Sequence, residues 1–322
     1  MTALTFTVTK TGTTELPVSV NFATADGTAF GNASCGVGFD YQNQTGMLSF
    51  APSDLTKAIT VQVCGDVVKE LDDTFLVNLS SPFNAAISDS QGVGTISNDD
   101  NVTLSVNDIS QAEGNSGTTA FTFTVTKTGA TDLTTTVNFA TADGTALGNA
   151  SCGAGFDYQS QTGMLSFAPS DLTKTITVQV CGDLVQEIND IFLVNLSGAV
   201  NAIISDNQGQ GTIVNDDVPA LSINDISQAE GNSGMTAFTF TVTKTGATEL
   251  PVSVNFSTAD GTALGNASCG VGIDYQSNSG MLSFAPSDVT KTITVNVCGD
   301  LVVEGTDTFF VNLSSPMNAT IS

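Results

Sequence analysis

Three acidic side chains fall within eight residues of a single turn in the middle of the chain. The turn runs from Cys181 to Phe192, and its acids are Asp183, Glu187 and Asp190. The segments on either side alternate between polar and apolar residues, as half-buried strands do. Carboxylates this close together repel one another unless a cation lies between them. The turn therefore predicts a cation-binding site, and nearly the same sequence recurs at residues 64–75 and 298–309.

The charge of the whole chain is one-sided. Its 322 residues include 32 acidic and 7 basic side chains, all seven of them lysine, and no histidine. Nucleic acid and anionic membrane are not expected as partners, because both bind cationic surfaces. Without histidine no Ser-His-Asp or Cys-His arrangement can form, and we expect no enzyme. Solubility or a saline habitat is the alternative interpretation of the acidity, so the positions of the acids must decide.

No run of about 18 apolar residues is present, so no direct insertion into a membrane is expected. Met1 leads directly into an alternating segment at residues 4–8, without the basic and apolar regions of a signal peptide. If the protein is exported, we expect the export signal to lie outside this sequence.

The sequence repeats itself with a period the size of a domain. Cys35, Cys152 and Cys269 are 117 residues apart (152−35 and 269−152), and the second cysteine of each copy follows the same period. A period this long indicates an array of domains and not a solenoid. Only the central copy is complete, so the sequence looks like an excerpt of a longer array. The expected domains are residues 1–100, which lack the first strand, 101–217, which are complete, and 218–322, which lack the last strand.

An alternation with a period of two runs through each copy. In the central copy it is clear in residues 121–126, 135–141 and 173–180, where Thr alternates with Val, Ile or Phe. Clusters of Gly, Asn and Asp interrupt these runs at the spacing typical of a sandwich. No segment has a sustained helical period. The pattern predicts an all-β chain of tandem Ig-like antiparallel β-sandwiches.

Strand direction sends most acids of the central copy to one end of its sandwich. Successive strands alternate in direction, so every second turn lies at the same end. Of the twelve acids in residues 101–217, seven are expected there, whereas Lys127 and Lys174 lie at the opposite end. Calcium suits such a cluster because it accepts oxygen ligands from several loops in flexible geometry, and magnesium ranks second because it demands stricter geometry. The alternative is that Asp and Asn simply favour turns. The seven acids are Glu113, Asp143, Asp183, Glu187, Asp190, Asp216 and Asp217.

The central copy contains several distinctive motifs, each with a close counterpart in at least one other copy: Glu-Gly after the first strand, Thr-Ala-Asp-Gly-Thr-Ala at 141–146, Gly-Phe-Asp-Tyr at 155–158, the Gly-Asp turn from 182, and Gly-Thr-Ile-Val-Asn-Asp-Asp at 211–217. Together they resemble the Calx-β domain, a family that includes the calcium-sensing domains of sodium/calcium exchangers and repeats of bacterial surface proteins. The resemblance implies an Ig-like sandwich whose loops at one end bind calcium, with the same seven ligands in the central copy. The corresponding residues of the outer copies are Asp26, Asp66, Glu70, Asp73, Asp99, Asp100, Glu230, Asp260, Asp300, Glu304 and Asp307.

Some positions depart from the acidic pattern of the exchanger domains. Gly182 precedes Asp183, Asn215 begins the terminal Asn-Asp-Asp, and Asp190 replaces a longer Glu. Fewer or shorter ligands predict weaker binding, in the range of about 10⁻⁴ to 10⁻³ M that extracellular calcium modules have. Only the central site is expected to be whole. We interpret Asp157, which precedes Tyr158, as structural, in a capped loop beside a core tyrosine.

Each copy contains two cysteines 29 residues apart (181−152). Two cysteines without histidine cannot complete a tetrahedral zinc site, so a disulfide or two buried thiols remain. A disulfide would tie a loop to the acidic turn and would favour an oxidising compartment, outside the cell or on its surface. The disulfide is the favoured alternative. The expected pairs are Cys35–Cys64, Cys152–Cys181 and Cys269–Cys298.

We therefore expect a calcium-binding structural repeat array of a larger secreted or cell-surface protein. Calcium at one end of each sandwich would stiffen the junctions between neighbouring repeats, for adhesion or as a stalk. The alternative is a calcium-sensing regulatory module of an attached protein or membrane transporter. A direct adhesin is a third hypothesis, but no exposed aromatic cluster indicates a contact face.

Overall fold

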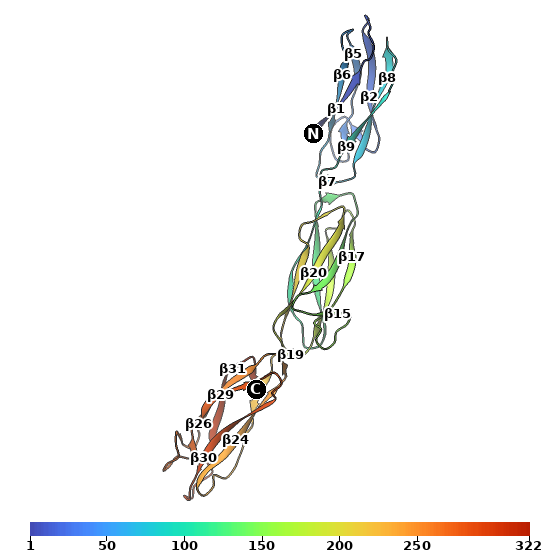
Figure 1. Cartoon of the computed structure of the whole chain (residues 1–322). Helices are drawn as coiled ribbons and strands as arrows, with labels where there is room; N and C mark the ends of the chain where they lie inside the picture. Colours follow the sequence, from blue (N-terminus) through green and yellow to red (C-terminus); the bar gives the residue numbers. More distant parts are fainter.

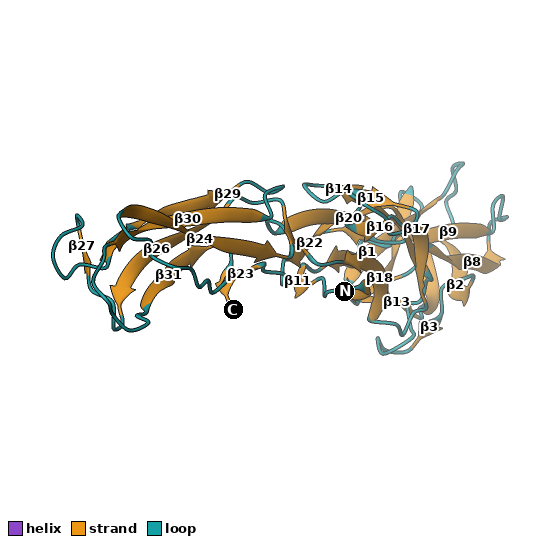
Figure 2. Ribbon diagram, turned by 90° about the horizontal axis from the view of Figure 1, so that it is seen from below, coloured by secondary structure: helices purple, strands orange, loops and turns teal.

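The computed structural model describes all 322 residues and contains strands without helices. Three β-sandwiches follow one another end to end along an elongated molecule (Figure 1). The all-β fold of tandem antiparallel sandwiches is thus as predicted, and Figure 2 shows the molecule from below, with orange strands joined by teal loops. None of its segments forms a helix that could cross a membrane.

The central sandwich consists of two sheets. One contains, in spatial order, β15 (Gly148–Asn149), β16 (Tyr158–Gln159), β18 (Thr173–Gly182), β12 (Gly117–Thr128), β10 (Thr103–Val106) and β21 (Ile203–Ile204). The other contains β11 (Ile109–Ala112), β22 (Gln208–Val214), β20 (Asp190–Val200), β14 (Thr135–Asp143) and β17 (Thr162–Phe167).

The outer sandwiches repeat this order with fewer strands. In the first, the two sheets are β1 (Thr2–Thr9), β6 (Thr56–Val63), β4 (Tyr41–Gln42) and β3 (Gly31–Asn32), and β5 (Thr45–Phe50), β2 (Val18–Asp26), β8 (Asp73–Phe83) and β9 (Gln91–Ile96). In the third, they are β27 (Gly265–Asn266), β28 (Tyr275–Gln276), β30 (Thr290–Gly299), β24 (Gly234–Thr245), β23 (Ala220–Ile223) and β32 (Thr320–Ile321), and β29 (Ser279–Phe284), β26 (Val252–Asp260) and β31 (Phe309–Met317).

Each sandwich has its own core, built by the alternation seen in the sequence. Along β12 the side chains of Phe121, Phe123 and Val125 are fully buried, while the threonines between them face outward. Tyr158 stacks on Phe192 with ring centroids 4.6 Å apart. Each fully buried phenylalanine contributes roughly 1.5–3 kcal/mol. These side chains anchor the strands whose ends carry the acids.

The start of the central copy crosses from one sheet to the other. Direction alternating along the chain predicts a single first strand at residues 102–110, but the structure has two, β10 and β11, which belong to different sheets. At the crossing, the Oδ1 atom of Asn107 accepts the Thr124 N–H at 2.5 Å, and Oδ1 of Asp108 accepts the Gln210 N–H at 2.7 Å. These side chains replace the ladder bonds that the backbone gives up where it changes sheets. As a result β11 lies beside β22, which decides where Glu113 comes to lie.

Two short parallel pairs connect the sandwiches. β7 (Val68–Lys69) pairs with β13 (Ala130–Thr131), and β19 (Val185–Gln186) pairs with β25 (Ala247–Thr248). Figure 1 shows β7 and β19 at the two junctions. Both β7 and β19 belong to the acidic turns. Each turn therefore serves its own repeat and contacts the next one.

Candidate metal centre

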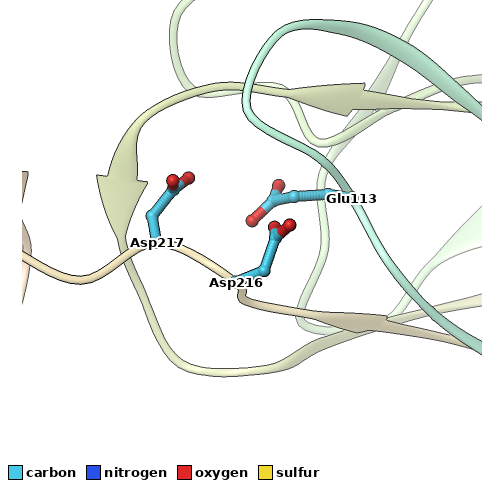
Figure 3. Close-up of side chains that lie close together, drawn as sticks. All are labelled: Glu113, Asp216 and Asp217. Atoms are coloured by element: carbon cyan, nitrogen blue, oxygen red, sulfur yellow. The ribbon is translucent and has the colours of Figure 1, made fainter.

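Two strands of the central copy deliver three carboxylates to one place. β11 and β22 run parallel, with Ile109 opposite Gly211 and Ala112 opposite Val214, so the residues after both strands emerge side by side. Glu113 follows β11, and Asp216 and Asp217 come shortly after β22. One carboxylate oxygen of each of these three acids lies within 4.8 Å of the other two (Figure 3). We call these three residues the acidic triad.

Two members of the triad are buried. Glu113 and Asp217 are only 4% and 5% exposed, whereas Asp216 is exposed. The Oδ1 atom of Asp217 accepts the Asn115 side-chain amide at 3.0 Å, but its Oδ2 atom is buried without any hydrogen-bond partner. A buried carboxylate oxygen without a partner is costly. Such an atom fits a site that a cation completes.

No basic side chain neutralises this end of the sandwich. The three ion pairs of the chain join Lys57, Lys174 and Lys291 to an aspartate three residues earlier in the sequence. Burial, with the charges of Asp183, Glu187 and the two other triad members, raises the pKa of Glu113 from 4.5 to about 8. Burial and neighbouring charges likewise raise the pKa of Glu187 to about 7. The negative charges of these carboxylates therefore repel one another at this end of the sandwich.

Asn215 positions two parts of the site. Its Oδ1 atom accepts the Glu187 N–H at 3.0 Å, and its side-chain amide donates to the Asp217 carbonyl oxygen at 2.9 Å. Its own N–H donates to Oδ1 of Asn189 at 3.1 Å. A carboxylate at this position could not donate to Asp217, because an ionised acid only accepts hydrogen bonds. The amide in place of an acid is thus explained by the bonds that hold the turn against the triad.

Two glycines allow Glu113 to lie close to the other two members of the acidic triad. Gly114 has a φ of +83°, in the left-handed region that favours glycine. A Cβ atom on Gly182 would lie 2.1 Å from the Gly114 carbonyl oxygen and 2.9 Å from that of Glu113. Any side chain at position 182 would therefore displace the Glu113–Gly114 turn. The departure at Gly182 is a packing requirement of this site.

Asp143 forms two hydrogen bonds within its own loop. Its Oδ1 atom accepts the Tyr158 hydroxyl at 2.6 Å and the Gly148 N–H at 2.8 Å. Asp26 and Asp260 accept the tyrosine hydroxyls of their own copies in the same way, at 2.7 and 2.6 Å. These three acids lie at the expected end, but each is bonded within its own loop, and Asp143 is not part of the triad.

Asp157 caps its loop, in line with the structural interpretation of this residue, and it also faces the cluster. Burial and the charges of Asp190 and Asp183 raise its pKa, while its Oδ2 atom accepts the Leu147 N–H at 2.7 Å. Its carbonyl oxygen accepts the N–H of Cys181, two residues before Asp183. The sequence offered one sign that Asp157 lies near the acidic turn. Asp157 comes directly before Tyr158, and the strand of Tyr158 pairs with β18 at Val180.

The first copy shows the convergence of its acids most directly. A cavity of about 440 Å³ lies at its acidic end, next to β1 and β9. Six carboxylates line this cavity, including Asp40, the counterpart of Asp157. Asp26 is not among them. The six are Asp40, Asp66, Glu70, Asp73, Asp99 and Asp100.

The acids of the third copy also share one end, but they are more exposed. Burial and the charges of Asp300, Asp274, Glu230 and Asp307 raise the pKa of Glu304. The turn from residue 300 to residue 308 contains no strand. This copy does not gather three carboxylates as closely as the triad.

Three disulfide bonds tie a loop of each copy to the acidic turn: Cys35–Cys64, Cys152–Cys181 and Cys269–Cys298. Cys181 lies at the end of β18, two residues before Asp183. In the central copy the Cα atoms of the bridge are 5.6 Å apart. No cysteine is free.

The fold and the site together define a class of protein: tandem antiparallel β-sandwiches with acidic loops gathered at one end. The family model of the Calx-beta domain matches the chain three times, at residues 1–101, 97–217 and 215–321. The chain belongs to the Calx-beta domain family, and the resemblance seen in its motifs is confirmed.

Curated relatives include sodium/calcium exchanger 1 of Rattus norvegicus, which is 29% identical over 206 residues, covering 58% of this chain and 20% of the exchanger. Sodium/calcium exchanger 1 of Felis catus is 30% identical over the same length, again covering 58% of this chain and 20% of that protein. The chain thus spans about a fifth of the length of these relatives.

Among solved structures, CBD12 from CALX1.2 is similar with a TM-score of 0.34 and 22% identity, covering 67% of this chain and 82% of that one. The apo-form Calx CBD1 domain matches with a TM-score of 0.32 and 22% identity, covering 37% of this chain and 100% of that one.

Proposed function

We propose that the chain is a calcium-binding structural array of a larger secreted or cell-surface protein, with calcium bound at the acidic end of each sandwich. The observation that carries the proposal is the acidic triad with the buried, unpartnered Oδ2 atom of Asp217. The donors are all oxygen atoms, which is the chemistry that calcium selects. Magnesium is the weaker candidate, because donors that come from separate loops do not impose its strict octahedron.

The central copy offers ligands from three segments. Glu113 follows β11, Asp216 and Asp217 follow β22, and the turn after β18 adds Asp183 and Glu187, whose charges act on Glu113. A bound cation would neutralise charges that otherwise repel, and would thereby hold the three segments together. Asn215 and the Cys152–Cys181 bridge would keep the turn in reach when the ion is absent.

The proposed mechanical role follows from the position of this end. Asp217 is separated from Ala220, the first residue of β23 in the next sandwich, by only two residues. The acidic turn contributes β19 to the pair with β25 of that sandwich. Calcium that orders the turn and the residues after β22 would then stiffen the junction. Residues 1–100, 101–217 and 218–322 would be the units of the array, serving as a stalk or in adhesion.

The setting and the absence of catalysis are parts of the same proposal. Three disulfide bonds and no free thiol suit an oxidising compartment, such as the outside of a cell. The clustered carboxylates bind a cation in this account and act on no substrate. The named relatives favour a second candidate, a calcium-sensing module that regulates an attached protein or transporter.

Small-angle scattering of the full chain tests the structural role. We expect the distance distribution to narrow, and the maximum dimension to become better defined, when EDTA is replaced by millimolar calcium. The matched variant carries Asp183→Asn with Asp217→Asn. Its second junction should not stiffen, so its scattering profile should change less than that of the unsubstituted chain when EDTA is replaced by calcium. Identical profiles for the unsubstituted chain in both conditions, despite calorimetric calcium binding, would remove the stiffening role and leave the sensing module.

A further inference from the structure

The beginning and the end of the central sandwich are joined directly, by strands that point the same way. β11 is the outermost strand of its sheet and pairs in parallel with β22, the last strand of this sandwich. All other neighbours in that sheet are antiparallel. The pairing of β11 with β22 therefore closes the repeat, because it links the segment by which the chain enters to the segment by which it leaves.

Further hydrogen bonds join the same two segments before and after the paired residues. Before β11, the Oδ1 atom of Asp108 accepts the Gln210 N–H at 2.7 Å. After β11, the Gly114 N–H donates to Oδ1 of Asp216 at 3.2 Å. We call β11, β22 and these flanking bonds the terminal clamp.

Tension along the molecule reaches the two strands of the terminal clamp from opposite ends of the sandwich. The chain enters at Val102, which lies against Gly129, directly before the strand β13 of the first junction. It leaves after Val214, at the end that carries β19 and contacts the third sandwich. Since the sandwiches follow one another end to end (Figure 1), a pull on the neighbours draws β11 backward through β10 and draws β22 forward.

The parallel direction of the two strands decides how this load acts. It slides β11 along β22, so that all bonds of the terminal clamp bear the load together. Two strands pulled apart from one end would instead lose their bonds one after another, each at a lower force. The central sandwich therefore has the geometry that resists a pull along the array.

The two outer sandwiches lack this pair of strands. In the first, β9 is the counterpart of β22 and has no strand on its outer side. In the third, residues 226–229 have the same sequence as β11, Ile-Ser-Gln-Ala, but form no strand. The chain thus contains its own comparison, with one sandwich that has the terminal clamp and two that do not.

We propose that the terminal clamp is the force-bearing element of the repeat, so that the pairing of β11 with β22 sets the force at which the central sandwich unfolds. The inference rests on the stalk role in the proposed function, and it requires no bound calcium. The central sandwich should therefore unfold at a higher force than the two outer ones.

Single-molecule force spectroscopy of the full chain, held by its two ends in EDTA, tests this difference. A background with Cys152→Ser and Cys181→Ser identifies the central event. The bridge closes a loop of 29 residues, and its loss lengthens the unfolding step by about 100 Å, at ~3.3–3.6 Å per extended residue. The outer sandwiches keep their bridges and their shorter steps. We expect the longer step to occur at the highest force.

Two proline variants in this background test the pairing itself. Gln111→Pro removes an N–H directed at β22, because alternate residues face the same neighbour and the Glu113 N–H donates to the Val214 carbonyl oxygen. Ser110→Pro is the matched control, since its N–H faces the open edge of the sheet, where proline is tolerated. At constant force, Gln111→Pro should unfold the central sandwich roughly three- to tenfold faster, as the loss of one backbone hydrogen bond does to a barrier. Ser110→Pro should leave this rate unchanged.

A core variant, Ile176→Val, separates lost load bearing from lost stability. It removes a buried methylene group and destabilises the sandwich in urea without touching the terminal clamp. For the same loss of stability in urea, it should speed forced unfolding less than Gln111→Pro does.

Three results would overturn the inference while leaving the calcium site in place. They are a central event no stronger than the outer ones, equal rates for Gln111→Pro and its parent, and equal rates for the two proline variants. The first comparison needs no substitution in the terminal clamp, so it decides the matter even where a proline variant does not fold. Absence of calcium binding in calorimetry would instead refute the proposed function and leave the result in EDTA unchanged.

Discussion

Replacing Glu113 by Gln should stabilise the central repeat without calcium and reduce its gain from calcium. Glu113 is only 4% exposed and lies against Asp216 and Asp217. Burial and the surrounding charges raise its pKa from 4.5 to about 8. Between these values the folded state binds more protons than the unfolded state. The stability of the calcium-free repeat therefore falls as the pH rises through this window.

The size of the effect follows from this shift in pKa. At pH 7, holding the proton on Glu113 costs the folded state about 3 kcal/mol, at roughly 1.36 kcal/mol per pH unit above 4.5. Gln carries no charge, so Glu113→Gln should recover about 1–3 kcal/mol in EDTA, with part lost to imperfect amide bonding. For a dissociation constant near 10⁻³ M, 10 mM calcium stabilises the unsubstituted repeat by about 1.4 kcal/mol. The variant should gain less than this.

Urea unfolding of the full chain, followed by tyrosine fluorescence, measures both effects, because each core contains one buried tyrosine (Tyr41, Tyr158 or Tyr275). The difference between Glu113→Gln and the unsubstituted chain in EDTA should shrink from pH 7 to pH 5. Glu230→Gln is the matched control, since Glu230 is not part of a close triad. A variant that is less stable in EDTA at pH 7, or that gains as much from calcium as the parent, would refute the reasoning.

Three further outcomes are expected. Gly182→Ala should weaken calcium binding in the central repeat, because its Cβ would meet the Gly114 carbonyl oxygen at 2.1 Å, whereas Gly65→Ala, with nothing within 4 Å, should not change binding by calorimetry. Replacing Cys152 and Cys181 by Ser should cost the central repeat about 3–4 kcal/mol in urea unfolding, through loss of loop closure. Lys174 forms a 2.7 Å ion pair with Asp171 and lowers the pKa of that aspartate. The stability that this pair adds should therefore be present at neutral pH and lost as the pH falls below about 4. In Lys174→Met, thermal melts should show a smaller fall in melting temperature between neutral and acidic pH.

The sequence predicted the sandwich and the end to which the acids go, because both depend on local alternation and strand direction. Phe121 and Phe123 alternate with threonines, and the structure buries them as this pattern requires. The pairing of β11 with β22 could not be read from the sequence. The crossing at Asn107 and Asp108 depends on bonds to Thr124 and to Gln210, a residue 102 positions away from Asp108.

Which acids lie closest together was harder to predict than the end of the sandwich at which they gather. Asp143 follows a strand to the correct end, but the Tyr158 hydroxyl engages it there. Asp157 looked structural and is so through Leu147, yet it also faces the cluster. The junction pair of β19 and β25 is only two residues long on each side. Such a contact has no periodic pattern, because the packing of two separate domains creates it.

The central claim is that the acidic triad binds calcium, and a calorimetric titration of the full chain tests it most directly. The unsubstituted chain should bind calcium with dissociation constants of about 10⁻⁴ to 10⁻³ M. Asp217→Asn should lose the sites of the central repeat, because it removes the charge of the buried carboxylate whose Oδ2 atom has no partner. The control Asp206→Asn alters an exposed acid whose carboxylate caps the Gln208 N–H, and it should bind as the parent does. Equal binding by Asp217→Asn and the parent, or no binding by the parent, would contradict the account.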